Sequence, residues 1–172
     1  MYNIIKMEVS LKPLESTWVL WFHDPSNKDY SFESYVCIGE IKCAYHLWAI
    51  FEKISPEMLI SGMYFFMREG YRPMWESPEN AGGGAWSKKI NSTDSTHVFV
   101  EMVVNCASEE LVISDFANTL VGVSISPKGP SSIIKIWNTN SKVNKVTCLN
   151  AGIALLEGGE GIAYTPHGGR PR

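Results

Sequence analysis

The stretch PMWESPENAGGGAW at residues 73–86 combines two tryptophans, a carboxylate directly after the first of them, and three consecutive glycines. Trp75 and Glu76 together suit a flat, nitrogen-rich ring, because an indole offers a stacking face and a carboxylate offers two acceptors in one plane. Guanine carries a ring N–H and an amino group on one edge, which matches those acceptors. Stacking contributes about 1–3 kcal/mol per base, and a cationic base such as 7-methylguanine adds about 1–2 kcal/mol when desolvated. The segment therefore predicts recognition of a purine base.

Signatures of catalysis and of metal binding are missing from the sequence. The glycine run is not a phosphate loop, since no GxxxxGK[ST] occurs, and no Gly-x-Ser-x-Gly elbow is found. The cysteines form no CxxC pair and have no histidine at zinc-finger spacing. We therefore expect a protein that is not an enzyme and that binds no metal and no cofactor. We also expect four reduced thiols in or near the core: Cys37, Cys43, Cys106 and Cys148.

Length and charge restrict the class of protein. A chain of 172 residues with 45% hydrophobic content suits one domain, residues 1–172, with flexible ends at about 1–12 and 168–172. A net charge of −3 argues against a wide basic surface for duplex nucleic acid. The sequence contains no signal-peptide core and no apolar run long enough for a membrane span, so we expect a soluble, cytoplasmic protein, with the nucleus as an alternative location.

Strand and helix patterns alternate along the chain. Strands are predicted at 17–22, 35–38, 63–69, 86–90, 118–126, 132–138 and 161–165, and helices at 43–54, 96–108 and 141–156. Several connections between strands are too short for parallel crossovers. The pattern therefore predicts an α+β arrangement, an antiparallel sheet with helices on one face.

The first two predicted helices have more apolar surface than one core stripe requires. Beyond that stripe, Ala44 and Trp48 form a second stripe, and Val100 and Val104 lie beside Glu101 on another. Either both helices are broadly buried, or these positions form an exposed patch that receives a partner helix. Periodicity alone leaves both interpretations open.

Several segments, in order and spacing, resemble the eukaryotic translation initiation factor 4E family of messenger-RNA cap-binding proteins. They are KPLESTWVLWF (12–22), PMWE (73–76), GGGAW (82–86), FVEMVV (99–104), IKIW (134–137) and IAYTPH (162–167). The resemblance implies a curved antiparallel sheet of about eight strands with three helices on its convex face. It also implies that a 7-methylguanosine cap lies on the concave face between two aromatic side chains.

Carried over by position, the resemblance makes Trp75 a stacking residue and Glu76 the reader of the guanine edge. Trp137 matches the tryptophan that contacts the N7-methyl group, and His167 matches a histidine near the pocket rim. The family's second stacking tryptophan has no equivalent in this sequence. Tyr30 falls within one residue of its place, and Phe32 is the competing candidate.

The resemblance also points to changes where the family binds the cap phosphates. The family's basic residues are replaced here by Ser126, Ile133 and Ala85. Lys135 shares a strand face with Trp137, and Lys128 lies in the neighbouring hairpin, so both are candidate substitutes. Arg170 and Arg172 are candidates for contacting the second nucleotide.

On the partner side, the family receives a Tyr-x-x-x-x-Leu-hydrophobic helix from the scaffold initiation factor and from repressor proteins. The matching positions are Pro13, Leu14, Ala44, Trp48, Val100, Glu101 and Val104. We therefore expect a monomeric translation initiation factor that binds capped mRNA and recruits the scaffold factor. The alternatives are a repressor-type member that binds caps without productive recruitment, and a protein-interaction module with weakened cap binding.

Overall fold

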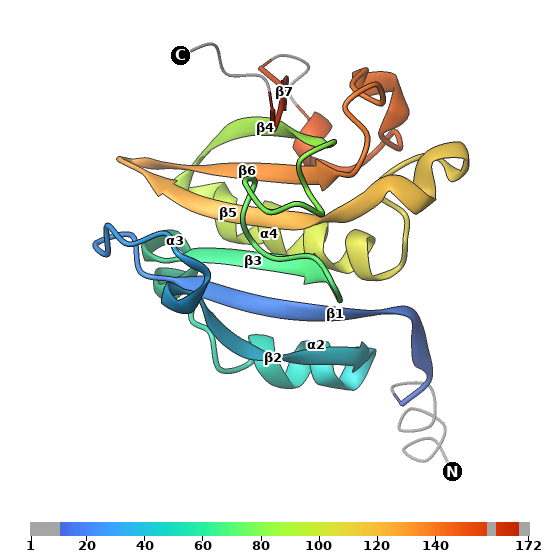
Figure 1. Ribbon diagram of the computed structural model, residues 1–172. Coiled ribbons are helices and arrows are strands. Elements are labelled where there is room, and N and C mark those ends of the chain that lie inside the picture. Colours follow the sequence, from blue (N-terminus) through green and yellow to red (C-terminus); the bar gives the residue numbers. More distant parts are fainter. Residues whose placement is uncertain (1–10, 158–160, 169–172) are drawn as a thin grey trace.

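The computed structural model describes residues 11–157 and 161–168, and its centre is one antiparallel sheet (Figure 1). The strand order is β2-β1-β3-β5-β6-β4-β7, and all pairings are antiparallel. The strands are β1 (Pro13–His23), β2 (Val36–Cys43), β3 (Met63–Arg68), β4 (Gly84–Asn91), β5 (Leu120–Lys128), β6 (Ser131–Asn138) and β7 (Ala163–Pro166). The described residues thus form seven strands, where about eight were expected.

The described part of the chain forms three α-helices, which lie behind the curved sheet in Figure 1, on its convex side. They are α2 (Ala44–Phe51), α3 (Pro56–Ser61) and α4 (Ser92–Ala107). The opposite side, which we call the open face, is crossed by the β3–β4 connection. The α+β class and the placement of the helices on one face are therefore as predicted.

The prediction of a helix at 141–156 is wrong. This segment contains only two short 3-10 turns, η3 (Val146–Cys148) and η4 (Ala154–Leu156), separated by Gly152 at φ 88°. Its backbone bonds to another part of the chain, since the Asn150 amide donates to the Leu111 carbonyl at 3.1 Å. The apolar spacing that suggested a helix instead anchors an irregular segment on the core.

The third helix is α3, which the sequence analysis did not predict. Its first turn is capped by Ser55, whose hydroxyl accepts a hydrogen bond from the Met58 amide at 3.3 Å. Pro56 occupies the first helical position, where the missing N–H has no cost. Because the helix has only six residues, its periodicity is too short to detect.

Strand alternation divides the aromatic side chains between two hydrophobic clusters, because successive side chains point to opposite faces. The larger cluster lies between sheet and helices and includes Trp18, Trp86 and Phe99, each 0% exposed. The smaller one lies on the other face of the sheet and consists of Phe65, Met67, Ala85, Val121 and Trp137, with partly buried aromatics packed against it. Trp86 is therefore a core residue, and Trp137 faces the open side.

Two further expectations have clear outcomes. Cys43, Cys106 and Cys148 are buried free thiols, but Cys37 is exposed on the edge strand β2, so its expected place near the core is wrong. No helix within residues 11–157 and 161–168 is long and apolar enough to cross a membrane. The expected flexible ends, and the candidates Arg170 and Arg172, lie largely or wholly outside the described residues.

Candidate functional site

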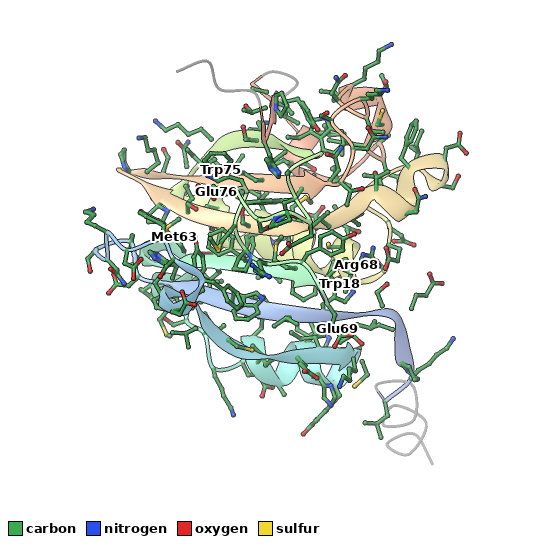
Figure 2. All side chains as sticks on the ribbon, viewed as in Figure 1. Trp18, Met63, Arg68, Glu69, Trp75 and Glu76 are labelled. Atoms are coloured by element: carbon green, nitrogen blue, oxygen red, sulfur yellow. The ribbon has the colours of Figure 1, made fainter. Side chains whose placement is uncertain are left out.

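The loop between β3 and β4 carries Trp75 and Glu76 in front of the sheet (Figure 2). Both side chains are exposed, and Trp75 has 45% of its surface accessible. The loop conformation is held by the side chain of Asn80, which is 0% exposed. Its amide nitrogen donates to the carbonyls of Arg72 at 2.8 Å and Met74 at 2.7 Å, and to the Ser77 hydroxyl at 3.0 Å. The chain on both sides of the Trp-Glu pair is therefore held in place by one buried side chain.

The end of the loop is pinned to the last strand and to β6. The His167 amide donates to the Gly83 carbonyl at 2.9 Å, and Nδ1 of His167 lies 3.0 Å from the Asn80 carbonyl oxygen. A Cβ at Gly83 would lie 1.8 Å from the Asn138 carbonyl oxygen, so only glycine fits there. The glycine run therefore serves close packing between backbones.

A cavity of about 240 Å³ opens beside Trp75 on this face. Its lining comes from the loop, β4, β6 and the β7 end of the chain: Trp75, Ala85, Ser87, Ile133, Lys135, Trp137, Thr165, Pro166 and His167. Trp137 is 3% exposed and its indole N–H donates to the Ser124 hydroxyl at 2.9 Å. The indole nitrogen is thus satisfied within the sheet, and the ring forms part of the cavity wall.

The residues that line this cavity carry a small positive charge. Lys135 is the only lysine or arginine among the described lining residues, and its Nζ lies 6.0 Å from the Trp137 ring centroid. Burial lowers the pKa of His167, and the nearby Lys135 charge lowers it further, while the contact with the Asn80 carbonyl acts in the opposite direction. His167 is therefore neutral at pH 7. Its ring contacts that of Trp137 at a centroid distance of 4.8 Å.

The β1–β2 loop presents the candidate second aromatic. Tyr30 is 47% exposed, whereas Phe32 is half-buried, with its ring 5.3 Å from that of Trp21 and the Arg72 guanidinium 5.4 Å from its centroid. Of the two candidates, Tyr30 is the one that presents its ring to solvent.

The pKa of Tyr35 responds both to Tyr30 of this loop and to Glu76 of the β3–β4 loop. Burial raises the pKa of Tyr35 to about 12, and the negative charges of Glu76 and of ionised Tyr30 add to that effect. Both groups therefore lie within electrostatic range of the Tyr35 hydroxyl, although they come from different loops. Tyr35 is half-buried, and its ring packs against Phe65 of the smaller cluster. The sequence analysis predicted no role for Tyr35, because its pattern indicates only a strand residue.

The predicted binding residues are thus only partly brought together. Trp75, Trp137 and Lys135 share the cavity, with His167 at its wall. Tyr30 and Glu76 do not line it, and both lie within electrostatic range of Tyr35. Lys128 is exposed at the end of β5, outside the cavity lining.

The helix side carries a separate apolar hollow of about 280 Å³, between α2, α3 and α4. Trp48 is 50% exposed at its edge and Val100 is part of its wall, with Phe51, Glu52, Ile54, Pro56, Leu59 and Thr96 completing the lining. Val104 is 36% exposed on the same helix as Val100. The second stripe of α2 is therefore exposed at Trp48.

The other predicted partner positions differ in accessibility. Pro13 is exposed, while Leu14 and Ala44 are half-buried. One carboxylate oxygen of Glu101 accepts a hydrogen bond from the Ala154 amide at 2.8 Å, and the other lies 4.0 Å from His97 Nε2. Part of the acceptor capacity of Glu101 is therefore used within the chain.

Comparisons with known proteins find one family over almost the whole chain. The sequence model of the family described as eukaryotic initiation factor 4E matches residues 13–168. Among curated relatives, eukaryotic translation initiation factor 4E-1B of Danio rerio is 26% identical over 146 residues, which cover 81% of this chain and 67% of that protein. Eukaryotic translation initiation factor 4E-4 of Caenorhabditis elegans is 29% identical over 134 residues, covering 74% of this chain and 61% of that protein. The chain thus spans about two thirds or less of these relatives.

Solved structures share the fold. C. elegans eIF4E-3 in complex with the 4E-binding protein Mextli superposes with a TM-score of 0.77 at 17% identity, covering 91% of this chain and 93% of that one. Ascaris suum eIF4E-3 in complex with the m2,2,7G cap superposes with a TM-score of 0.66 at 18% identity, covering 75% and 74%. The family match extends over the open-face loop, the cavity and the helix side alike, and the chain belongs to the eukaryotic initiation factor 4E family.

Proposed function

We propose that this chain binds the 7-methylguanosine cap of messenger RNA on its open face and acts in translation initiation without catalysing a reaction. The observation that carries the proposal is the β3–β4 loop. Buried Asn80 and the contact with His167 fix its shape, so that exposed Trp75 and Glu76 stand beside a cavity walled by Trp137. A loop ordered before binding loses little entropy when the ligand arrives.

The base would be held between two aromatic rings from different loops. Trp75 supplies one ring, and Tyr30 supplies the exposed ring of the β1–β2 loop. Glu76, which directly follows Trp75, would accept from the ring N–H and amino group of guanine. The charges of Glu76 and Tyr30 both act on Tyr35, which supports placing their two loops beside one base. We assign the contact with the N7-methyl group to Trp137, which forms part of the cavity wall.

The charge distribution supports recognition led by the base. Lys135 brings one positive charge to the cavity, and the neighbouring wall positions Ala85 and Ile133 are apolar. Lys128 lies farther out, at the end of β5, where an extended phosphate chain can reach it. Affinity should therefore depend strongly on the methylated base and only modestly on the number of phosphates.

The helix side is the proposed docking surface for a scaffold factor or a repressor with a Tyr-x-x-x-x-Leu-hydrophobic helix. Trp48 and the apolar hollow beside Val100 suit the apolar face of such a helix. Glu101 retains acceptor capacity on the oxygen that faces His97, and Pro13 and Val104 extend the exposed surface. The related eIF4E-3 solved with Mextli supports this assignment.

The test is retention of the purified protein on 7-methyl-GTP resin, with elution by free 7-methyl-GTP but not by GTP. Glu76→Ala should reduce retention at least about tenfold, because each hydrogen bond to a charged group contributes about 1.5–3 kcal/mol. The matched control is Glu57→Ala, which removes an exposed glutamate from α3 on the other side of the sheet. Full retention of Glu76→Ala would remove Glu76 from the site.

A further inference from the structure

His23, the last residue of β1, is a buried imidazole that the binding scheme above does not use. It is 0% exposed. Its Nε2 lies 2.8 Å from the Asp29 carbonyl oxygen. A carbonyl oxygen only accepts, so Nε2 must carry the hydrogen and donate it. Within the described residues Nδ1 is buried and has no hydrogen-bond partner, so its burial calls for an explanation.

The His23 ring contacts two tyrosine rings. The imidazole stacks on Tyr30, with ring centroids 4.7 Å apart and planes inclined by only 13°. Tyr35 contacts the same imidazole at 4.7 Å with a tilt of 46°. One face of the Tyr30 ring is thus supported from the protein interior, while the residue remains 47% exposed.

The connection between His23 and Tyr30 is a loop ordered by its own side chains. Asp24, Asn27 and Asp29 each accept a hydrogen bond from the amide two residues ahead, at 2.8, 2.9 and 2.8 Å. Such Asx turns fix the local backbone. The bond from His23 to the Asp29 carbonyl closes this loop onto the strand, immediately before the residue that carries the exposed ring.

We propose that His23 is a positioning residue for Tyr30: its N–H fixes the backbone before Tyr30, and its ring sets the plane of the tyrosine side chain. This inference rests on the proposed cap-binding function. This positioning explains how Tyr30 can serve as the second stacking residue of the base site. His23 supports one face of the Tyr30 ring, so the ring presents its other face to the base in one orientation. A ring held in advance discriminates better for a cationic base than one that must be ordered on binding.

Two substitutions separate the two contacts. His23→Phe keeps a flat ring beneath Tyr30 but removes the donor, and His23→Gln keeps a donor but removes the ring. Each should weaken 7-methyl-GTP binding about three- to tenfold, the effect of one hydrogen bond or one aromatic pair. Each should also lower the ratio of 7-methyl-GTP to GTP affinity. A role confined to folding would lower the melting temperature and leave that ratio unchanged.

The decisive arm is a double-mutant cycle with Tyr30→Leu, measured by tryptophan fluorescence titration. If His23 acts through Tyr30, then His23→Phe and His23→Gln should change affinity less than twofold in the Tyr30→Leu background. The same fold loss in both backgrounds would overturn the proposal, as would wild-type affinity for both His23 variants.

A ligand-free readout keeps the inference separate from the proposed function. Amide hydrogen exchange at Asp29 and Ser31 should accelerate in His23→Phe, because the loop is released from the strand, and unchanged exchange would refute the positioning role. Failure of the wild-type protein to bind 7-methyl-GTP would refute the proposed function, while the exchange measurement would still decide whether His23 orders the loop.

Discussion

Replacing Asn80 by alanine tests whether the β3–β4 loop is ordered before the ligand binds. The substitution removes an NH2 group whose two hydrogens are shared among three acceptors, the Arg72 and Met74 carbonyls and the Ser77 hydroxyl. Two hydrogen bonds at a net contribution of about 0.5–1.5 kcal/mol each give a total of about 1–3 kcal/mol. The side-chain oxygen of Asn80 has no partner within the described residues, so its removal offsets part of that loss. We take about 2 kcal/mol as the expected effect.

The loss should appear mainly in ligand affinity. If the substitution lowers the population of the ordered loop, the apparent Kd rises by the same factor, and a loss of about 2 kcal/mol sets the maximum rise at roughly thirtyfold. The assay is tryptophan fluorescence titration with 7-methyl-GTP, together with thermal unfolding.

The matched control is Asn150→Ala, which removes two amide bonds, to the Glu110 and Val112 carbonyls, away from the loop. It should lower thermal stability and leave affinity unchanged. Wild-type affinity for Asn80→Ala, or equal losses of affinity in both variants, would refute preordering by Asn80.

Three further predictions follow from the site and the helix side. Lys135→Ala should weaken 7-methyl-GTP by about three- to tenfold and 7-methylguanosine by less than twofold in the same titration; equal losses would remove Lys135 from phosphate binding. Trp48→Ala should abolish binding of a Tyr-x-x-x-x-Leu-hydrophobic peptide, measured by calorimetry, while cap retention stays intact; loss of both would indicate a core role. Burial depresses the pKa of His167, so the contribution of the neutral ring to stability is present above about pH 6.5 and is lost as pH falls through the lowered pKa. The free energy of unfolding, measured from pH 7 to 5, should therefore decline, and His167→Asn should reduce that decline. An identical decline in the variant would contradict this role of His167.

The base-binding role of the Trp75–Glu76 pair was predicted from residue types alone, from what an indole and an adjacent carboxylate can hold, and it stays a prediction. Its fixation by Asn80 and His167 depends on contacts that no sequence pattern encodes, since His167 lies 87 residues from Asn80. Strand alternation, by contrast, explains why Trp137 faces the cavity and Trp86 the core.

The wrong helix at 141–156 has a specific cause. Val143, Leu149, Ile153 and Leu155 are all buried, so the segment has the apolar content of a core helix. Gly152 at φ 88° interrupts it, and the backbone of residues 111–113 takes hydrogen bonds that a helix would have kept within itself. Periodicity cannot distinguish side chains buried from a helix from those buried by an irregular segment that lies on the core.

The contact between His23 and Tyr35 could not be predicted from the sequence pattern. His23 ends a strand and Tyr35 directly precedes the next, so the pattern indicates two ordinary strand-end residues. The antiparallel pairing of β1 with β2 brings the Tyr35 ring against His23, whose ring also stacks on Tyr30. Such a cluster becomes visible once the register of the sheet is known.

The most direct test of cap recognition is a paired titration of the wild-type protein with 7-methyl-GTP and GTP, followed by tryptophan fluorescence under the same salt conditions. Stacking between Trp75 and Tyr30 should favour the cationic base by about five- to thirtyfold, which corresponds to a cation–π contribution of about 1–2 kcal/mol. Equal affinities for the two nucleotides, or no binding of either, would contradict the assignment of the open face as a site for the methylated cap.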